Sequence, residues 1–243
     1  MENILTMCDM HIPYHDVSAV NAAFKFAKYI NPEIVVIGEW LDMYQISKFV
    51  KDPNRINDLQ SDIDLCVEYL RKLRKILPNA RIIDVKSNHH IRLVKFLQTR
   101  APELYNLRDI KLEKLLKFKE LGIEHKDAFE YKGIVWLHGD TVRKYAGYTA
   151  RAELEKNGMS VVSQHTHRLA NYYERKRGGK LMAIESGCLC DVNPDYISGT
   201  ANWMQGVSLV TFRDKKSKHY YGSAIPIIDG TLIYGNKIFK GEK

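Results

Sequence analysis

The sequence predicts an α/β protein, and three features of its pattern support that prediction. Short, apolar, β-branched runs at residues 4–7 and 34–37 are typical of buried parallel strands. Between them, residues 17–30 carry apolar side chains at helical spacing, so the first 40 residues are expected to form a βαβ unit. Beyond residue 168 the pattern changes to short strands separated by turn signals. A helix-rich first half is therefore followed by a strand-rich second half.

The longest helical pattern covers residues 57–77, where seven apolar side chains form one stripe and Pro78-Asn79 ends it. A third strand is expected at residues 81–85. Residues 90–121 are expected to be mostly helical, with a break at Ala101-Pro102. This segment is strongly basic, which fits either a solvated helix face or a face that binds phosphate.

In the second half, strands are expected at residues 134–137 and 160–163 on either side of a helix at 148–157. Further strands are expected at 170–173, 181–185, 206–212, 219–222 and 231–234. Turn signals at residues 177–179 and 229–230 indicate hairpins. No repeat or linker interrupts the chain, so residues 1–243 are expected to form one domain.

Composition excludes some classes of protein. No apolar run approaches the roughly 20 residues that span a bilayer, and the first residues lack a signal-peptide pattern. The four cysteines form no C-x-x-C pair, which favours a reducing, cytoplasmic setting. Cys188 and Cys190 are interpreted as small apolar residues near a strand end, with a thiol or metal pair as the alternative. The net charge of +8 favours phosphate-bearing partners, including nucleic acid.

Polar residues that suit metal binding follow five of the expected strands. In chain order these are Asp9 and His11, then Glu39 and Asp42, then Asn88, His89 and His90, then His138, and finally His165 and His167. Six of the nine histidines lie just past a strand, which packing alone does not explain. Loops at strand ends are held by a rigid frame, so these groups are expected to meet at one site.

This ordered series resembles the calcineurin-like metallophosphoesterases over residues 1–170. Their motifs D-x-H, G-D-x-x-D, G-N-H-[D/E], a strand-end His and G-H-x-H correspond in this chain to segments 9–11, 38–42, 87–90, 138 and 164–167. The resemblance implies a four-layered α/β/β/α sandwich of two mixed β-sheets flanked by helices. It also implies a metal-dependent phosphoesterase, in which two divalent metals activate a water that attacks phosphorus.

The resemblance further implies a role for each residue. One metal would be held by Asp9, His11 and His167, the other by Asn88, His138 and His165, and Glu39 would bridge the two. His89 would hydrogen-bond the phosphate and protonate the leaving group, with Asp42 and His90 just behind these groups. Nitrogen and oxygen ligands without thiolates suit Mn²⁺, the expected metal, with Fe, Zn²⁺, Ni²⁺ and Co²⁺ as alternatives.

The sequence departs from the family pattern at four positions. Glu39 stands in place of aspartate, Ser87 and His90 stand in place of glycine and an acid, and Gln164 stands in place of glycine. No metal ligand is lost, so a working enzyme is favoured over a relative that only binds nucleic acid.

The substrate is expected to be a phosphodiester in nucleic acid or a nucleotide, hydrolysed by a phosphodiesterase or nuclease-type activity. The basic segment 92–119 and the cations Arg143, Lys144 and Arg168 favour this over a phosphomonoesterase or protein phosphatase. Ordinary surface lysines are the competing interpretation. Tyr14 and Tyr44 are expected to line the cleft, and Trp40 and Trp203 to pack in the core. The sequence leaves the oligomeric state open.

Overall fold

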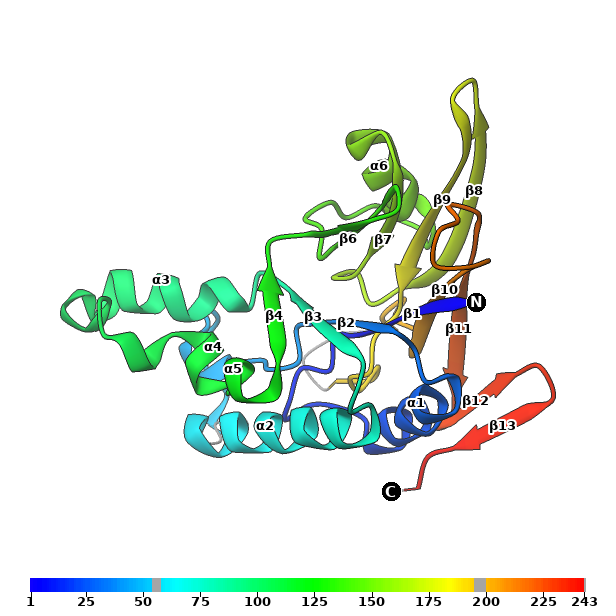
Figure 1. Cartoon of the computed structure of the whole chain (residues 1–243). Coiled ribbons are helices and arrows are strands. Elements are labelled where there is room, and N and C mark those ends of the chain that lie inside the picture. Colours follow the sequence, from blue (N-terminus) through cyan, green and yellow to red (C-terminus); the bar gives the residue numbers. More distant parts are fainter. Residues whose placement is uncertain (54–57, 195–199, 243) are drawn as a thin grey trace.

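Two mixed β-sheets form the centre of the molecule in the computed structural model, which describes residues 1–53, 58–194 and 200–242 (Figure 1). The larger sheet has the strand order β13-β12-β11-β10-β1-β2-β3-β4, and the smaller has the order β5-β6-β7-β9-β8. Strands β1 to β4 are mutually parallel, as are β6, β7 and β9, whereas the outer strands add antiparallel pairs.

The strands of the larger sheet come from both ends of the chain. They are β1 (Glu2–Cys8), β2 (Ile34–Gly38), β3 (Arg81–Val85), β4 (Ile123–Lys126), β10 (Gly206–Phe212), β11 (Tyr220–Ile228), β12 (Thr231–Tyr234) and β13 (Lys237–Lys240). The smaller sheet is formed by β5 (Phe129–Tyr131), β6 (Ile134–Leu137), β7 (Ser160–Ser163), β8 (Leu169–Lys176) and β9 (Gly179–Ser186).

Alternate side chains of each central strand enter two separate cores. Ile4 and Val36 pack between the two sheets with Trp136 and Phe212, whereas their neighbours Leu5 and Val35 pack against helices. This period of two explains why the runs in β1 and β2 are apolar throughout: both of their faces are buried.

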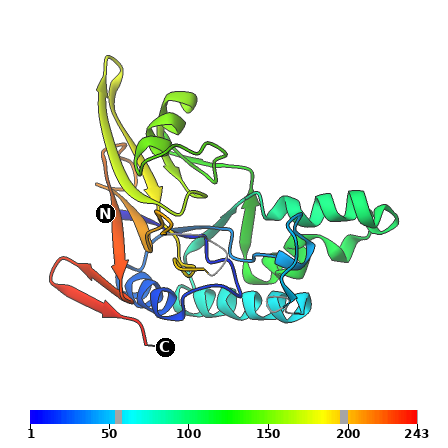
Figure 2. The same cartoon turned by 180° about the vertical axis from the view of Figure 1, so that it is seen from behind.

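Helices cover the outer face of each sheet. The helices α1 (Val17–Ile30) and α2 (Leu59–Ile76) lie along the larger sheet, and α6 (Tyr148–Asn157) covers the smaller one (Figures 1 and 2). The Asp16 and Asp58 carboxylates cap the first turns of α1 and α2 by accepting backbone N–H bonds. The expected α/β/β/α layering is confirmed.

The 90–121 segment projects to one side of the sheets (Figure 1). It contains α3 (His90–Arg100), followed by only short pieces: η3 (Pro102–Leu104), η4 (Arg108–Ile110), α4 (Leu112–Leu115) and α5 (Phe118–Leu121). The expected break at Ala101-Pro102 is present, and the segment is mostly helical as expected. Beyond the break the helix is divided into short turns, and the left-handed Lys117 separates the last two.

Three strands were missed by the sequence pattern, namely β4, β5 and β13. They have four, three and four residues and lie at sheet edges, where alternation is too short to detect. No helix of the described residues is both long and apolar enough to cross a membrane.

Candidate metal centre

Seven polar side chains converge where β1, β2, β3, β6 and β7 end. We call this set the metal centre; it comprises Asp9, His11, Glu39, Asn88, His138, His165 and His167. Ligand atoms of Asp9, His11, Glu39 and His167 all lie within 4.8 Å of one another, and so do those of Glu39, His138 and His165. Parallel strands bring their carboxyl ends to the same edge, which explains the convergence.

Glu39 lies between the two groups of ligands. Its Oε1 is 3.2 Å from His11 Nε2, and its Oε2 is 2.8 Å from His138 Nε2. The carboxylate is almost fully buried, with 2% of its surface exposed. One side chain therefore faces both groups, the position that a bridging ligand requires.

Around His11 and His167, ring nitrogens face each other. The two Nε2 atoms are 3.0 Å apart, and Asp9 Oδ1 lies 3.6 Å from His167 Nε2. The Asp42 carboxylate accepts a 2.8 Å hydrogen bond from His11 Nδ1, which turns Nε2 of that ring toward Asp9 and Glu39.

The second group has the same character. His138 Nε2 is 3.0 Å from His165 Nδ1 and 2.7 Å from Asn88 Oδ1. The turn that carries His165 is fixed by its neighbour Thr166, whose hydroxyl donates a 2.7 Å hydrogen bond to Glu185 Oε1 in β9.

The polar atoms of the metal centre do not satisfy one another. Asp9 Oδ2 is buried without a hydrogen-bond partner among the described residues, and Glu39 Oε2 approaches His138 without forming a hydrogen bond. Facing ring nitrogens can share at most one proton. Buried polar atoms are normally paired, so this excess of lone pairs fits divalent cations, which accept lone pairs from every one of these atoms.

Backbone conformation supports the same interpretation. Ten non-glycine residues of the described chain have a positive φ, and five of them are Asp9, His11, Glu39, His165 and His167. Left-handed backbone is unfavourable for residues with a Cβ and is concentrated at functional sites. Backbone pairing holds two of these turns together: Asp9 N–H donates to Gly38 O, and His11 N–H donates to Glu39 O.

Charge in the metal centre is concentrated on Glu39 and His11. Burial acts to raise the pKa of Glu39, but His89, His138 and His11 hold it well below its usual value. Burial acts to lower the pKa of His11, but the Glu39 charge and the bond to Asp42 raise it to about 10. A bound cation would replace the proton on His11, because metal ligands must be deprotonated.

The remaining ligand candidates have different environments. Burial and the Glu39 charge raise the pKa of Asp9 to about 6. Burial and the charge of His11 hold the pKa of His167 well below its ordinary value, so that ring is neutral and able to coordinate.

His89 is buried beside Glu39 and Asp42. Its Nε2 is 3.1 Å from Glu39 Oε1, and its Nδ1 is 3.6 Å from Asp42 Oδ2. Burial lowers the pKa of His89 to about 3 despite the Glu39 charge. Arg92 donates to both the backbone and the carboxylate of Asp42, at 2.8 and 2.9 Å, so this carboxylate is fixed between His11 and a cation.

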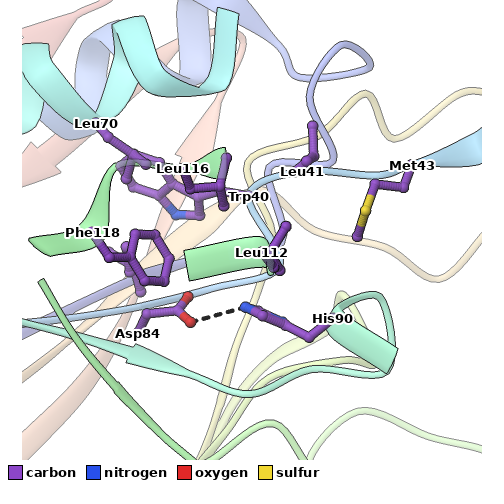
Figure 3. Close-up of a pocket in the computed structure, with 10 residues that line it drawn as sticks. Trp40, Leu41, Met43, Leu70, Asp84, His90, Leu112, Leu116 and Phe118 are labelled. Carbon is purple, nitrogen blue, oxygen red and sulfur yellow. Dashed lines mark hydrogen bonds and ion pairs between the residues drawn. The ribbon is translucent and has the colours of Figure 1, made fainter. Parts of the chain in front are cut away.

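His90 points away from the metal centre. Its Nε2 hydrogen-bonds Asp84 at 2.9 Å in a small cavity with walls that include Leu112 and Phe118 (Figure 3). Its Nδ1 accepts the Ser87 N–H at 3.0 Å. In the described residues it forms no hydrogen bond with a candidate ligand, and its link to Asn88 runs through the Ser87 turn.

The substrate residues predicted from sequence form two pairs. Tyr14 and Tyr44 contact each other edge to face, with ring centroids 6.4 Å apart. Arg168 donates a hydrogen bond to the backbone oxygen of Arg143. That these four side chains contact substrate stays a prediction.

Two residues beside His167 were not assigned to the site from the sequence. Trp203, expected in the core, is half-buried and its ring centroid lies 4.3 Å from that of His167. Cys190 Sγ is 3.8 Å from His167 Nδ1. The sequence offered a metal pair at Cys188 and Cys190 only as the alternative interpretation, and it placed Trp203 in the core. Trp40, by contrast, is in the core as expected.

The departure at Gln164 has a structural counterpart at Gly38. A Cβ at Gly38 would overlap Gln164 Oε1, so the glutamine side chain occupies the space over this glycine. The close approach that a glycine would allow at position 164 is instead provided at position 38.

No family model matches the sequence, and no curated protein matches it. Among solved structures, a single mutant of Vps29 from Entamoeba histolytica is similar, with 12% identity, a TM-score of 0.45, and coverage of 98% of this chain and 97% of that chain. Vps29 from Chaetomium thermophilum shows 13% identity, a TM-score of 0.44 and coverage of 92% and 96%. The same protein complexed with a RaPID-derived cyclic peptide shows 11% identity, a TM-score of 0.38 and coverage of 100% and 98%.

Proposed function

We propose that this chain is a metal-dependent phosphodiesterase with a two-metal centre. The observation that carries the proposal is the buried Glu39 carboxylate, which has one oxygen toward His11 and the other toward His138. A carboxylate shared by two groups of nitrogen and oxygen ligands suits a pair of divalent cations.

In this proposal Asp9, His11 and His167 hold one cation, and Asn88, His138 and His165 hold the other, with Glu39 shared. Mn²⁺ is the expected ion because the donors are nitrogen and oxygen atoms. When bound, such cations polarise phosphate oxygens and lower the pKa of a water molecule to near neutrality.

The protein itself orients the substrate and supplies a proton. His89 lies against Glu39, where a phosphate oxygen would neighbour it. That negative charge would raise the pKa of His89 from its low value and let the imidazole protonate the leaving oxygen. Asp42 fixes the tautomer of His11 and faces His89 Nδ1, so it positions both rings.

Turnover of small chromogenic esters tests the proposal. With Mn²⁺ added, bis-p-nitrophenyl phosphate is expected to be hydrolysed faster than p-nitrophenyl phosphate, and chelation is expected to stop the reaction. Hydrolysis of the monoester alone would show that the enzyme is a phosphomonoesterase and not a diesterase. Metal analysis of His138→Ala is expected to show the loss of one cation; full occupancy would contradict the ligand set.

A relative that binds nucleic acid without hydrolysing it is the second candidate, and Glu39 favours it. Glutamate is one methylene longer than the aspartate of the family pattern, which shifts the carboxylate between the metals. Glu39→Asp is expected to retain or raise turnover. Absence of turnover in both the wild type and this variant, with every metal tried, would leave binding as the function.

A further inference from the structure

A groove of about 660 Å³ lies beside the metal centre, between α3 and the segment around η1 (Tyr44–Ile46). Its walls contain four cationic side chains and two aromatic rings, namely Lys48, Arg92, Lys95, Arg100, Phe49 and Phe96. None of the described residues that line it is acidic. Its chemistry is therefore that of a site for a polyanion that also carries aromatic groups.

The groove begins at the metal centre. Asn88, a candidate ligand, is part of its lining, and Arg92 connects it to Asp42 through two hydrogen bonds. A chain bound with one phosphate at the cations would thus continue directly into the groove.

The cations are spaced along one face of α3. Arg92, Phe96 and Arg100 follow at intervals of four residues, and Lys95 lies beside them. The helix has 11 residues and extends about 16 Å. Each strand of a DNA duplex carries one phosphate per roughly 3.4 Å of axis, and an extended single strand spaces its phosphates more widely, so this face spans more than one phosphate and exceeds the reach of a mononucleotide.

The outer cations are available to a ligand. Lys95 and Arg100 are exposed, and within the described ranges neither forms an ion pair with a carboxylate. Phe49 is 59% exposed on the opposite wall, where Lys48 lies 5.8 Å from its ring centroid. Exposed rings next to cations are a stacking platform for unpaired bases.

We propose that this groove binds a single strand of nucleic acid that continues from the scissile phosphate along α3. The inference rests on the proposed function, because it defines the substrate of the same site as a polymer rather than a mononucleotide. In a duplex the faces of the bases are covered by stacking on the neighbouring base pairs and are closed to Phe49 and Phe96, so an unpaired strand fits the groove and a duplex does not.

Binding is tested on the intact chain in EDTA, which prevents cleavage, by fluorescence anisotropy of a labelled single-stranded 20-mer. The double variant Lys95→Glu/Arg100→Glu is expected to weaken binding at least tenfold and to reduce the slope of log K against log salt by about 1.4, or 0.7 per lost phosphate contact. Phe96→Leu, which keeps an apolar side chain, is expected to weaken binding by roughly tenfold through lost stacking.

The matched control is Lys215→Glu/Lys237→Glu. It makes the same change in net charge at two exposed lysines, beyond β10 and on β13, away from α3 (Figure 1). It is expected to change binding less than twofold. Equal effects of the two double variants, no binding of the strand by the wild type, or tighter binding of a duplex or an acidic peptide would each overturn the proposal.

Turnover separates this inference from the proposed function. The α3 double variant is expected to raise the KM for the oligonucleotide at least tenfold and to leave the hydrolysis of bis-p-nitrophenyl phosphate unchanged. An unaltered KM for the oligonucleotide would refute strand binding in the groove without contradicting the proposed diesterase activity. Strand binding without hydrolysis of either substrate would refute the proposed diesterase activity without contradicting strand binding in the groove.

Discussion

Two clusters of histidine and aspartate lie near the carboxyl ends of the central strands, and they differ in how their polar atoms are paired. In the cluster of Asp84, His90 and His125, one carboxylate oxygen accepts hydrogen bonds from both rings, at 2.9 and 2.6 Å. Asp84 and His125 are register partners on β3 and β4, so the sheet itself sets this contact. In the metal centre, nitrogen faces nitrogen and a buried oxygen of Asp9 has no partner among the described residues.

Residue type alone does not identify a metal site. The ligand atoms of the Asp84 cluster lie within 4.8 Å of one another, as do those of Asp9, His11, Glu39 and His167 in the metal centre. In the Asp84 cluster, His90 Nδ1 accepts the Ser87 N–H, which leaves Nε2 as the donor to Asp84. Donors and acceptors therefore match, and the cluster is a structural network. In the metal centre they do not match, which is why cations are proposed there.

The largest effect is expected from Glu39→Gln, which keeps the size of the side chain and removes its charge. Loss of the shared carboxylate is expected to release metal from both groups and to reduce diester hydrolysis to the rate without protein. Inductively coupled plasma mass spectrometry of the purified chain measures the first effect. Asp84→Asn is the matched control in the other cluster and is expected to keep its metals. If Glu39→Gln kept both cations, the difference that we propose between the two clusters would be contradicted.

His89→Ala is expected to have the next largest effect. His89 touches Glu39 and faces Asp42, and no cation is assigned to it. The variant is expected to keep its metal content while turnover of an oligonucleotide, whose leaving alkoxide needs a proton, falls about 10²- to 10⁴-fold, the usual contribution of a proton donor. Restoration of the rate with an ester whose leaving group needs no proton would support the acid role. A parallel loss of metal would instead make His89 a ligand.

Much of this arrangement was predictable because it follows from local pattern. The runs in β1, β2 and β3 are buried on both faces, so their ends, and the polar residues after them, could be located by composition alone. The ordered series from Asp9 to His167 then indicated which groups meet. The mismatch between hydrogen-bond donors and acceptors in the metal centre could be identified only from the three-dimensional structure.

Other features depend on contacts between distant segments and have no local signal. Asp84 is an ordinary polar residue within a strand until β4 places His125 beside it. Trp203 reaches His167 across 36 positions of sequence, and the groove exists only because η1 contacts α3. Tertiary packing, rather than periodicity, determines each of these.

Asp84→Ala is expected to reduce stability more than it reduces activity. It leaves the His90 and His125 donors without their shared acceptor, and loss of one partner from a buried charged network costs about 3 kcal/mol. Urea unfolding monitored by circular dichroism measures the free energy of unfolding. Asp84→Asn retains an acceptor oxygen and is expected to lose less unfolding free energy. Equal losses in the two variants would show that packing, not hydrogen bonding, accounts for the stabilisation by Asp84.

The smallest expected effect is a pH dependence of the unfolding free energy that arises from the Asp84 cluster. The hydrogen bond to Asp84 raises the pKa of His125 above its ordinary 6.5 against the effect of burial. Burial acts to raise the pKa of Asp84, but His90 and His125 hold it below 3.8. The stabilisation by charged His125 is therefore complete below pH 6.5 and is lost as pH rises through the folded pKa. The part due to Asp84 is lost only in acid.

His125→Phe tests this sign, because it keeps a ring against His90 and removes the charge and the donor. The difference in unfolding free energy between wild type and variant is expected to be larger at pH 5.5 than at pH 9 by about 1 kcal/mol. Metal content is expected to be the same in both proteins, since His125 contacts Asp84 and not the metal centre. A difference that does not change with pH would mean that His125 is neutral in the folded chain, and the pairing in the Asp84 cluster would then rest on neutral hydrogen bonds alone.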